Sequence, residues 1–155
     1  MRKKVIFILA ACLLPAAAAF AQTAQELDAL LETEAISCAQ AAYFVLAFVS
    51  DGESQSIDAD IQKSAFEQAM ANGWFKKGTK PEENATLGKL SFLIMKAFKM
   101  KSSLMYRIFP GPRYAFRTMV NRSLIQGTAD PGMKVNGDRF LMILGNVLDA
   151  AEGKQ

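Results

Sequence analysis

The sequence predicts an all-α fold, a small bundle of about five helices built from two and a half helix-loop-helix repeats of about 50 residues. First, apolar residues recur at helical spacing in five segments, whereas the alternation typical of strands is weak throughout. Second, similar residues lie 50 positions apart, as do Phe66 and Phe116, or Pro81 and Pro131. Third, residue types that cap helices open three apolar runs at nearly the same interval; they are Ser37, Thr86 and Asn136.

The three capped runs predict one set of helices, over residues 38–49, 87–99 and 137–150. Ser, Thr and Asn accept hydrogen bonds from the free amides of a first helical turn. Gln40 lies three residues after Ser37 and completes a capping box with it. The helix over 87–99 is apolar nearly all round, which places it in the middle of the bundle.

A second set of helices is predicted over residues 58–72 and 112–123. Asp58 is the expected cap of the first, and Pro112 suits the first turn of the second. Both helices are followed by a turn in which Gly permits left-handed backbone and Pro prevents the helix from continuing. Large apolar residues after each helix are expected to fold back onto the core; they are Trp74, Phe75, Leu124 and Ile125.

The chain is predicted to divide into a signal peptide (1–21), an N-terminal extension (22–35), the helical domain (36–151) and a short tail (152–155). The first segment combines a basic start, an apolar run over residues 5–14 and the motif Ala19-Phe20-Ala21, which is typical of cleavage before Gln22. A lipobox, Leu9-Ala10-Ala11-Cys12, is the alternative and would attach a lipid to Cys12. We therefore expect export to the periplasm or cell envelope, with a membrane as partner only if Cys12 is lipidated.

The composition excludes several functional classes. The chain has no His, which removes histidine-dependent catalysis and histidine metal sites. Of its two Cys, one lies in the predicted leader, so the mature chain would hold only Cys38 and could form neither an internal disulfide nor a cysteine zinc site. A non-enzymatic protein without cofactor or metal is therefore expected, with Cys38 as a small core residue.

Charge is unevenly distributed along the chain. Residues 22–83 hold 11 acidic and 4 basic residues, whereas residues 84–129 hold 8 basic and no acidic residues. Without the leader the net charge is zero, so nucleic acid is not an expected partner. The acid-free stretch either presents a positive binding face or pairs with the acidic first half, and the sequence leaves both interpretations open.

The most distinctive segment runs from Met105 to Tyr114 and combines two prolines, a glycine, two arginines and three aromatic residues. Arg binds carboxylates or phosphates, and aromatic rings stack on sugars or bases. The candidate ligand-binding residues are Tyr106, Arg107, Arg113, Tyr114 and Arg117. Alternatively, the aromatic residues pack a long loop onto the core and the arginines bind neighbouring carbonyls.

Two stretches of the chain share a glycine-containing turn that leads to a capped apolar helix. The clearer one runs Leu124-Ile125-Gln126-Gly127-Thr128-Ala129-Asp130-Pro131 and continues at Val135-Asn136-Gly137-Asp138-Arg139-Phe140-Leu141. The other includes Gly73-Trp74-Phe75, Pro81 and Thr86-Leu87-Gly88-Lys89-Leu90. Over about 115 residues this pattern resembles the S-layer homology domain. It is also similar to such modules in exported spirochaete envelope proteins, where stretches like Ser103-Leu104-Met105-Tyr106 occur.

The resemblance implies attachment to the cell envelope, commonly through a Thr-Arg-Ala-Glu-like tetrapeptide that binds wall-linked polysaccharide at a helix start. This chain has Thr86-Leu87-Gly88-Lys89 and Asn136-Gly137-Asp138-Arg139 there, so Lys89 and Arg139 are basic residues near the family's position. The expected function is a non-enzymatic, exported envelope module that binds an anionic wall component, peptidoglycan or glycan, or an envelope protein. The alternative is a periplasmic accessory subunit that acts only through protein–protein contacts.

Overall fold

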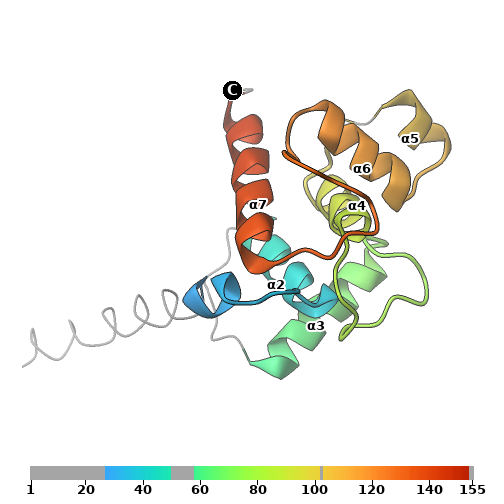
Figure 1. Cartoon of the computed structure of the whole chain (residues 1–155). Coiled ribbons are helices and arrows are strands. Elements are labelled where there is room, and N and C mark those ends of the chain that lie inside the picture. The colour runs from blue at the N-terminus through green and yellow to red at the C-terminus, as the bar shows by residue number, and fades with distance from the viewer. Residues whose placement is uncertain (1–26, 50–57, 102, 154–155) are drawn as a thin grey trace, which may run out of the picture.

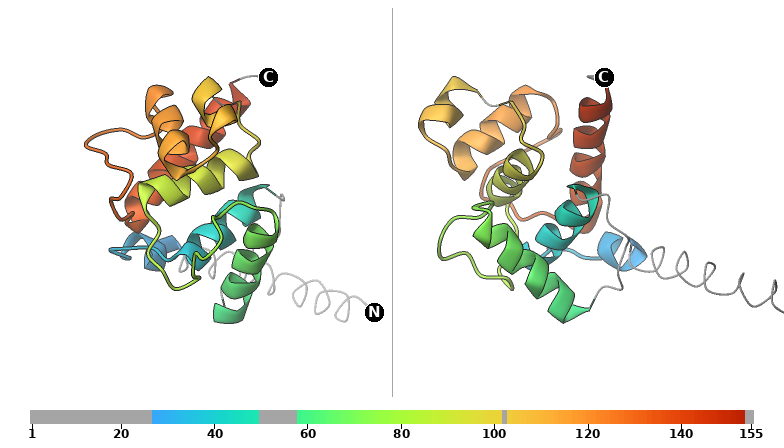
Figure 2. Two further views of the ribbon diagram at one scale, coloured as in Figure 1. Left: turned by 90° about the vertical axis from the view of Figure 1, so that its right-hand side faces the viewer. Right: turned by 180° about the vertical axis from the view of Figure 1, so that it is seen from behind.

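The structure, a computed structural model, describes residues 27–49, 58–101 and 103–153. The predicted signal peptide, the cleavage site before Gln22 and Cys12 lie outside the described residues. The helices in chain order are α2 (Cys38–Val49), α3 (Ala59–Ala71), α4 (Leu87–Ala97), α5 (Leu104–Ile108), α6 (Pro112–Asn121) and α7 (Gly137–Glu152). Residues 27–31 are also helical. Within the described residues there is no strand, and the predicted all-α fold is confirmed (Figures 1 and 2).

All five predicted helices are present, with ends that differ from the expected ones by at most two residues. The capping box is formed: Gln40 N–H donates to Ser37 Oγ at 3.1 Å, and Ser37 N–H donates to Gln40 Oε1 at 2.9 Å. Thr86 and Asn136 cap α4 and α7 through their side chains, as predicted. The expectation for Asp58 was wrong, because its side chain makes no capping hydrogen bond to α3 although it occupies the N-cap position. Pro112 stands in the first turn of α6.

Three backbone segments meet at the centre of the fold, each placed just before a helix cap. Ile36 N–H donates to Val135 O at 2.9 Å, Val135 N–H to Ala85 O at 3.1 Å, and Ala85 N–H to Ile36 O at 2.8 Å. These hydrogen bonds form a closed ring, and all three residues are fully buried. The ring joins equivalent positions of the two repeats to the segment before α2, which explains why the capped helices recur at an interval of about 50 residues.

A second set of hydrogen bonds repeats around this ring. The first residue of each capped helix donates its N–H to the turn before a different capped helix: Cys38 to Glu83 O, Leu87 to Met133 O, and Gly137 to Thr33 O. Thr33 thus takes the place that Glu83 and Met133 take in the two full repeats. Leu30 is also buried, with 3% of its surface exposed. Residues 27–35, which we expected to lie outside the domain as an extension, therefore complete its third unit.

Helix α4 forms the middle of the bundle, as its apolar sequence predicted. It packs against α2 on one side and α6 on the other. Its fully buried large apolar residues are Leu87, Leu90, Leu93 and Ile94. Helix α7 stands beside this layer and buries one face, with its Phe140 ring 6.0 Å from the ring of Phe44 in α2 (Figure 1).

The turns after α3 and α6 end these helices in the same way. Trp74 N–H donates to Ala69 O and Leu124 N–H to Met119 O, while the residue before each is left-handed. That residue is Gly73 (φ 68°) in the first repeat and Ser123 (φ 58°) in the second. This is the Schellman arrangement of a helix end. It turns Phe75, Leu124 and Ile125 back into the core, as predicted.

Candidate binding surface on α5 and α6

Helix α5 is an unexpected element, since the sequence had indicated a long loop here. Ser103 Oγ accepts a hydrogen bond from Tyr106 N–H and lies 3.0 Å from Thr118 Oγ1 of α6. Beneath the helix, the Tyr106 ring packs against Phe92 of α4 with 6.3 Å between ring centroids. These contacts hold α5 on α6 and present its opposite face to solvent.

Tyr106 therefore does not belong to an exposed ligand site, contrary to our expectation. Only 7% of its surface is exposed, because its ring is the residue that anchors α5 to the core. Burial raises the pKa of its hydroxyl, which finds no hydrogen-bond partner among the described residues. The alternative interpretation, that an aromatic residue pins this segment to the core, describes Tyr106 correctly.

Tyr114 is half-buried and stacks on Phe109, with ring centroids 6.4 Å apart and 28° between the ring planes. Both residues line a shallow hollow of about 370 Å³, together with Ile108, the Pro110-Gly111-Pro112 bend, Arg113 and Lys76. Lys76 comes from the turn after α3, in the other repeat. The hollow thus brings two cationic side chains beside two aromatic rings, a combination suited to an anionic or sugar-containing group.

The three candidate arginines are exposed. Arg107 lies on α5, and Arg113 and Arg117 lie one turn apart on α6. Within the part of the chain that the structure describes, none of the three forms a salt bridge; the ion pair found there is Lys89–Glu83. The proposed pairing of the basic stretch with the acidic first half is therefore not seen for these arginines, which leaves their charge available to a ligand.

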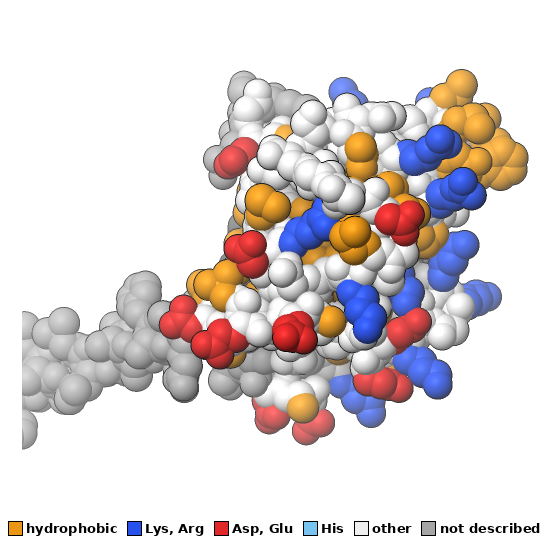
Figure 3. Space-filling view, in the orientation of Figure 1, with side chains coloured by type: hydrophobic (Ala, Val, Ile, Leu, Met, Phe, Trp, Pro, Cys, Tyr) orange, Lys and Arg blue, Asp and Glu red, His pale blue; other side chains and the backbone are white. Residues whose placement is uncertain are grey.

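Large apolar side chains surround these arginines, and sequence analysis did not identify them as part of a site. The exposed fractions are 69% for Leu104, 57% for Ile108 and 58% for Phe109, and Met105 is also exposed. Figure 3 shows hydrophobic side chains gathered at the edge of the molecule where α5 lies, with basic side chains next to them. Leu104 and Ile108 lie four residues apart, and this spacing was the one sequence signal that could have indicated a shared helical face.

The two basic residues near the position of the family tetrapeptide serve the fold itself. Lys89 Nζ lies 2.6 Å from Glu83 Oε1, and this hydrogen bond is the main reason why the pKa of the Glu83 carboxyl lies below its usual value. Arg139, the equivalent residue 50 positions later, donates to the carbonyls of Gln126 and Thr128. Both side chains therefore hold the turn that precedes their own helix.

Cys38 lies in the core, as its sequence context predicted. Cys38 is fully buried, and burial raises the pKa of its thiol to about 11. It therefore stays protonated at neutral pH and behaves as a small core residue. Among the described residues no group of acidic or cysteine side chains has an arrangement that would hold a metal ion.

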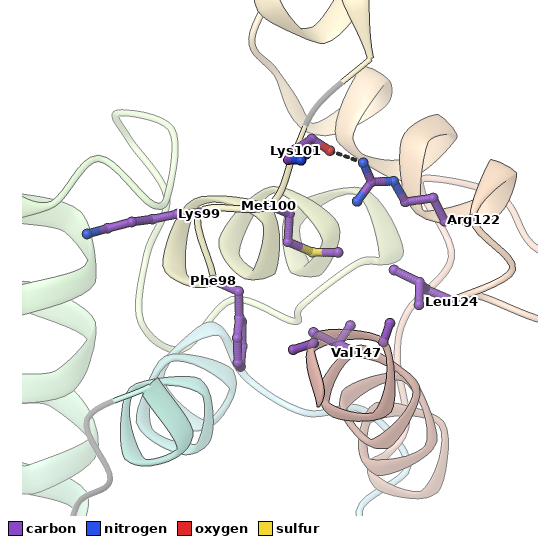
Figure 4. Close-up of a pocket in the computed structure, with 9 residues that line it drawn as sticks. Phe98, Lys99, Met100, Lys101, Arg122, Leu124 and Val147 are labelled. Atoms are coloured by element: carbon purple, nitrogen blue, oxygen red, sulfur yellow. Dashed lines mark hydrogen bonds between the residues drawn. The ribbon is translucent and has the colours of Figure 1, made fainter. Parts of the chain in front are cut away.

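A separate cavity of about 590 Å³ lies between the end of α4, the turn after α6 and α7. Figure 4 shows Met100, Leu124 and Val147 pointing into it, whereas Lys99 points away. Arg122 stands at its rim, but its guanidinium donates to the carbonyl of Lys101. None of the sequence-predicted site residues lines this cavity.

Comparison of the chain with protein-family models, with curated proteins and with solved structures found no match. Across residues 27–49, 58–101 and 103–153, no helix is both long and apolar enough to cross a membrane.

Proposed function

We propose that this protein is an exported, non-enzymatic module that attaches to an anionic component of the cell envelope. The single observation that carries the proposal is the set of exposed arginines on α5 and α6, which lack an acidic partner in the described residues. They lie in a stretch of 46 residues without a carboxylate, so no neighbour in the chain neutralises them. The resemblance to the S-layer homology domain supports an envelope location.

The attachment is proposed at the α5–α6 surface and not at the helix starts used by that family. Lys89 and Arg139, the basic residues at those starts, are engaged with Glu83 and with backbone carbonyls. Arg107, Arg113 and Arg117 have no such engagement in the described part of the structure. The hollow lined by Lys76 and Arg113 adds a further place for an anionic group.

The test is co-sedimentation with purified wall material and with whole envelope membranes, at about 0.1 M and at about 1 M salt. The Debye length falls from about 10 Å to about 3 Å over this range, so an electrostatic attachment should weaken strongly. The variant Arg113→Gln/Arg117→Gln should bind about thirtyfold more weakly at low salt and lose most of the salt dependence, because each of the two cations near an anionic surface contributes on the order of 1 kcal/mol.

The matched control is Lys63→Gln/Lys134→Gln, which removes the same charge from exposed positions that belong to neither α5 nor α6. It should bind like the unaltered protein. If both double variants bind equally well, or if the arginine variant binds less only because its thermal unfolding temperature has dropped, the arginines are structural and the proposal is wrong.

Export is tested separately by intact-mass analysis of the protein recovered from the envelope fraction. We expect a mature N-terminus at Gln22. A mass that includes a lipid on Cys12 would instead show that the lipobox is used.

A second candidate function is assembly with a protein partner. The exposed apolar side chains of α5 favour it, since such patches commonly mark interaction sites. Capture of one defined envelope protein, unaffected by salt and by the arginine changes, would support this function.

A further inference from the structure

The exposed face of α5 combines large apolar side chains with arginines. Of the six residues formed by α5 and its C-cap Phe109, four are large, apolar and exposed; they are Leu104, Met105, Ile108 and Phe109. Between them stands exposed Arg107, and α6 adds Arg113 and Arg117. Exposed apolar clusters of this kind mark interaction sites, and apolar residues mixed with Arg or Lys are typical of segments that lie in the membrane interface.

The fold holds this face in position. Tyr106 is buried on Phe92, Ser103 links α5 to Thr118, and the Phe109 ring stacks on Tyr114. The apolar side chains of Leu104, Met105 and Ile108 are thus presented by a supported element, and not by a loop that could fold them inward. Since the core already holds Tyr106 from this helix, the opposite face has no place inside the domain.

We propose that α5 and the segment joining it to α6 insert into the headgroup region of an anionic membrane, with the arginines on lipid phosphates. This inference rests on the proposed function and names the anionic component as a lipid surface. A wall polysaccharide would engage the arginines but leave Leu104 and Ile108 in water. A bilayer interface accommodates both groups at once, because its acyl boundary takes the apolar side chains and its phosphates take the guanidinium groups.

The hollow beside Arg113 fits the same orientation. Lys76 and Arg113 line it from two different repeats, and it adjoins the exposed Ile108 and Phe109 side chains. A lipid phosphate in the hollow would therefore lie between two cations while its acyl chains pass along α5. The depth of insertion is that of a short interfacial segment, since α5 has only five residues.

The experiment measures binding to vesicles of phosphatidylcholine alone and of phosphatidylcholine mixed with phosphatidylglycerol. It uses the protein as recovered from the cell envelope, and every variant is made in that same chain, so that any contribution of the N-terminal segment is common to all. We expect binding to the anionic vesicles and little to the neutral ones. The variant Leu104→Ser/Ile108→Ser should bind the anionic vesicles about tenfold or more weakly.

The matched control is Met142→Ser, because Met142 is an exposed apolar residue on α7, remote in the sequence from α5. It should bind vesicles like the unaltered protein. Insertion itself is followed with Phe109→Trp in a Trp74→Phe background, whose fluorescence should shift to shorter wavelength on anionic vesicles only.

The outcomes separate this inference from the proposed function. If the protein binds wall material in a salt-dependent way but not vesicles, the membrane inference is overturned and the proposed function stands. If Leu104→Ser/Ile108→Ser binds vesicles normally, or if the fluorescence of the Phe109→Trp variant does not shift, insertion of α5 is likewise overturned. If neither wall material nor anionic vesicles are bound, both proposals fail together.

Discussion

A Cβ atom on Gly137 would lie 1.6 Å from the carbonyl oxygen of Leu30, so the first residue of α7 touches the backbone of the N-terminal helical segment. No side chain fits between the two. The contact explains why a glycine opens α7, whereas Leu87 and Cys38 open the equivalent helices. It also provides a direct test of the finding that residues 27–35 belong to the domain.

Gly137→Ala should lower the free energy of unfolding by about 3 kcal/mol, because the backbone must move to admit the methyl group. Gly145→Ala is the matched control in the same helix. No atom lies within 4 Å of its added methyl group, and it should raise stability by about 0.5–1 kcal/mol. Urea denaturation measures both. Equal effects of the two changes would show that the N-terminal segment is not docked on α7.

Helix α4 should be the part of the core that tolerates truncation least. At most 1% of the surface of Leu90 or of Ile94 is exposed to solvent. Leu90→Ala or Ile94→Ala should each cost about 2–5 kcal/mol of unfolding free energy, through lost burial and the cavity left behind. Met142→Ala, at an exposed position of α7, is the comparison and should change stability by about 0.5 kcal/mol. A loss below about 0.5 kcal/mol for both α4 changes would contradict the central position of this helix.

The two left-handed turn residues, 50 positions apart, should respond to substitution in opposite directions. Ser123 adopts a φ of 58° at the position where the first repeat has Gly73. Ser123→Gly should gain up to about 1 kcal/mol by relieving the strained backbone, and Gly73→Ser should lose about as much. The loss in Gly73→Ser comes from backbone strain and not from a steric clash, because a Cβ on residue 73 meets no atom within 4 Å. Thermal unfolding of both variants checks the pair, and a loss of stability in Ser123→Gly would contradict it.

The Lys89–Glu83 contact should make stability depend on pH in the acidic range. The hydrogen bond from Lys89 lowers the pKa of Glu83 in the folded protein. A carboxyl with a lowered folded-state pKa adds stability above its unfolded pKa, and this contribution is lost as the pH falls through the folded-state value. Lys89→Met should therefore raise the pKa of Glu83 toward its usual 4.5, as measured by NMR titration.

Lys89→Met should also have a lower free energy of unfolding than the unaltered protein at neutral pH. In acid, where Glu83 is protonated in both proteins, their free energies of unfolding should become equal. The expected difference is small, because both side chains are partly exposed to solvent. Lys63→Met, on α3, is the control and should leave the titration of Glu83 unchanged. A Glu83 titration that Lys89→Met does not move would show that the ion pair is absent in solution.

The elements that the sequence predicted are those whose signals are local. The helix starts at Ser37, Thr86 and Asn136 could be predicted because a capping side chain accepts hydrogen bonds from the amides of the helical turn that directly follows it. Gly73 and Pro81 likewise mark a turn through their own backbone preferences. By contrast, the third unit of the ring depends on hydrogen bonds between Ile36 and Val135, and backbone pairing between distant segments leaves no trace in side-chain pattern.

Only part of the candidate site could be predicted from the sequence, because the rest depends on contacts between distant segments. Arg107, Arg113 and Arg117 are exposed, as a charged surface requires. Tyr106 faces the core instead, and only the rotation of α5 about its axis decides which aromatic residue points inward. That rotation is set by Phe92 and Thr118, which belong to other helices. Lys76 was not predicted as a site residue because it lines the hollow from the other repeat, far away in the sequence.

The closed ring of Ile36, Ala85 and Val135 has a consequence for when the protein can fold. Its three members come from the beginning, the middle and the end of the domain, so no shorter continuous fragment contains the complete centre. During synthesis the core stays open until the chain has been made past Val135, and long-range closure of this kind slows folding. For the exported chain proposed above, such late closure would leave the polypeptide unfolded, and able to pass through a translocation pore, until the segment around Val135 has been made.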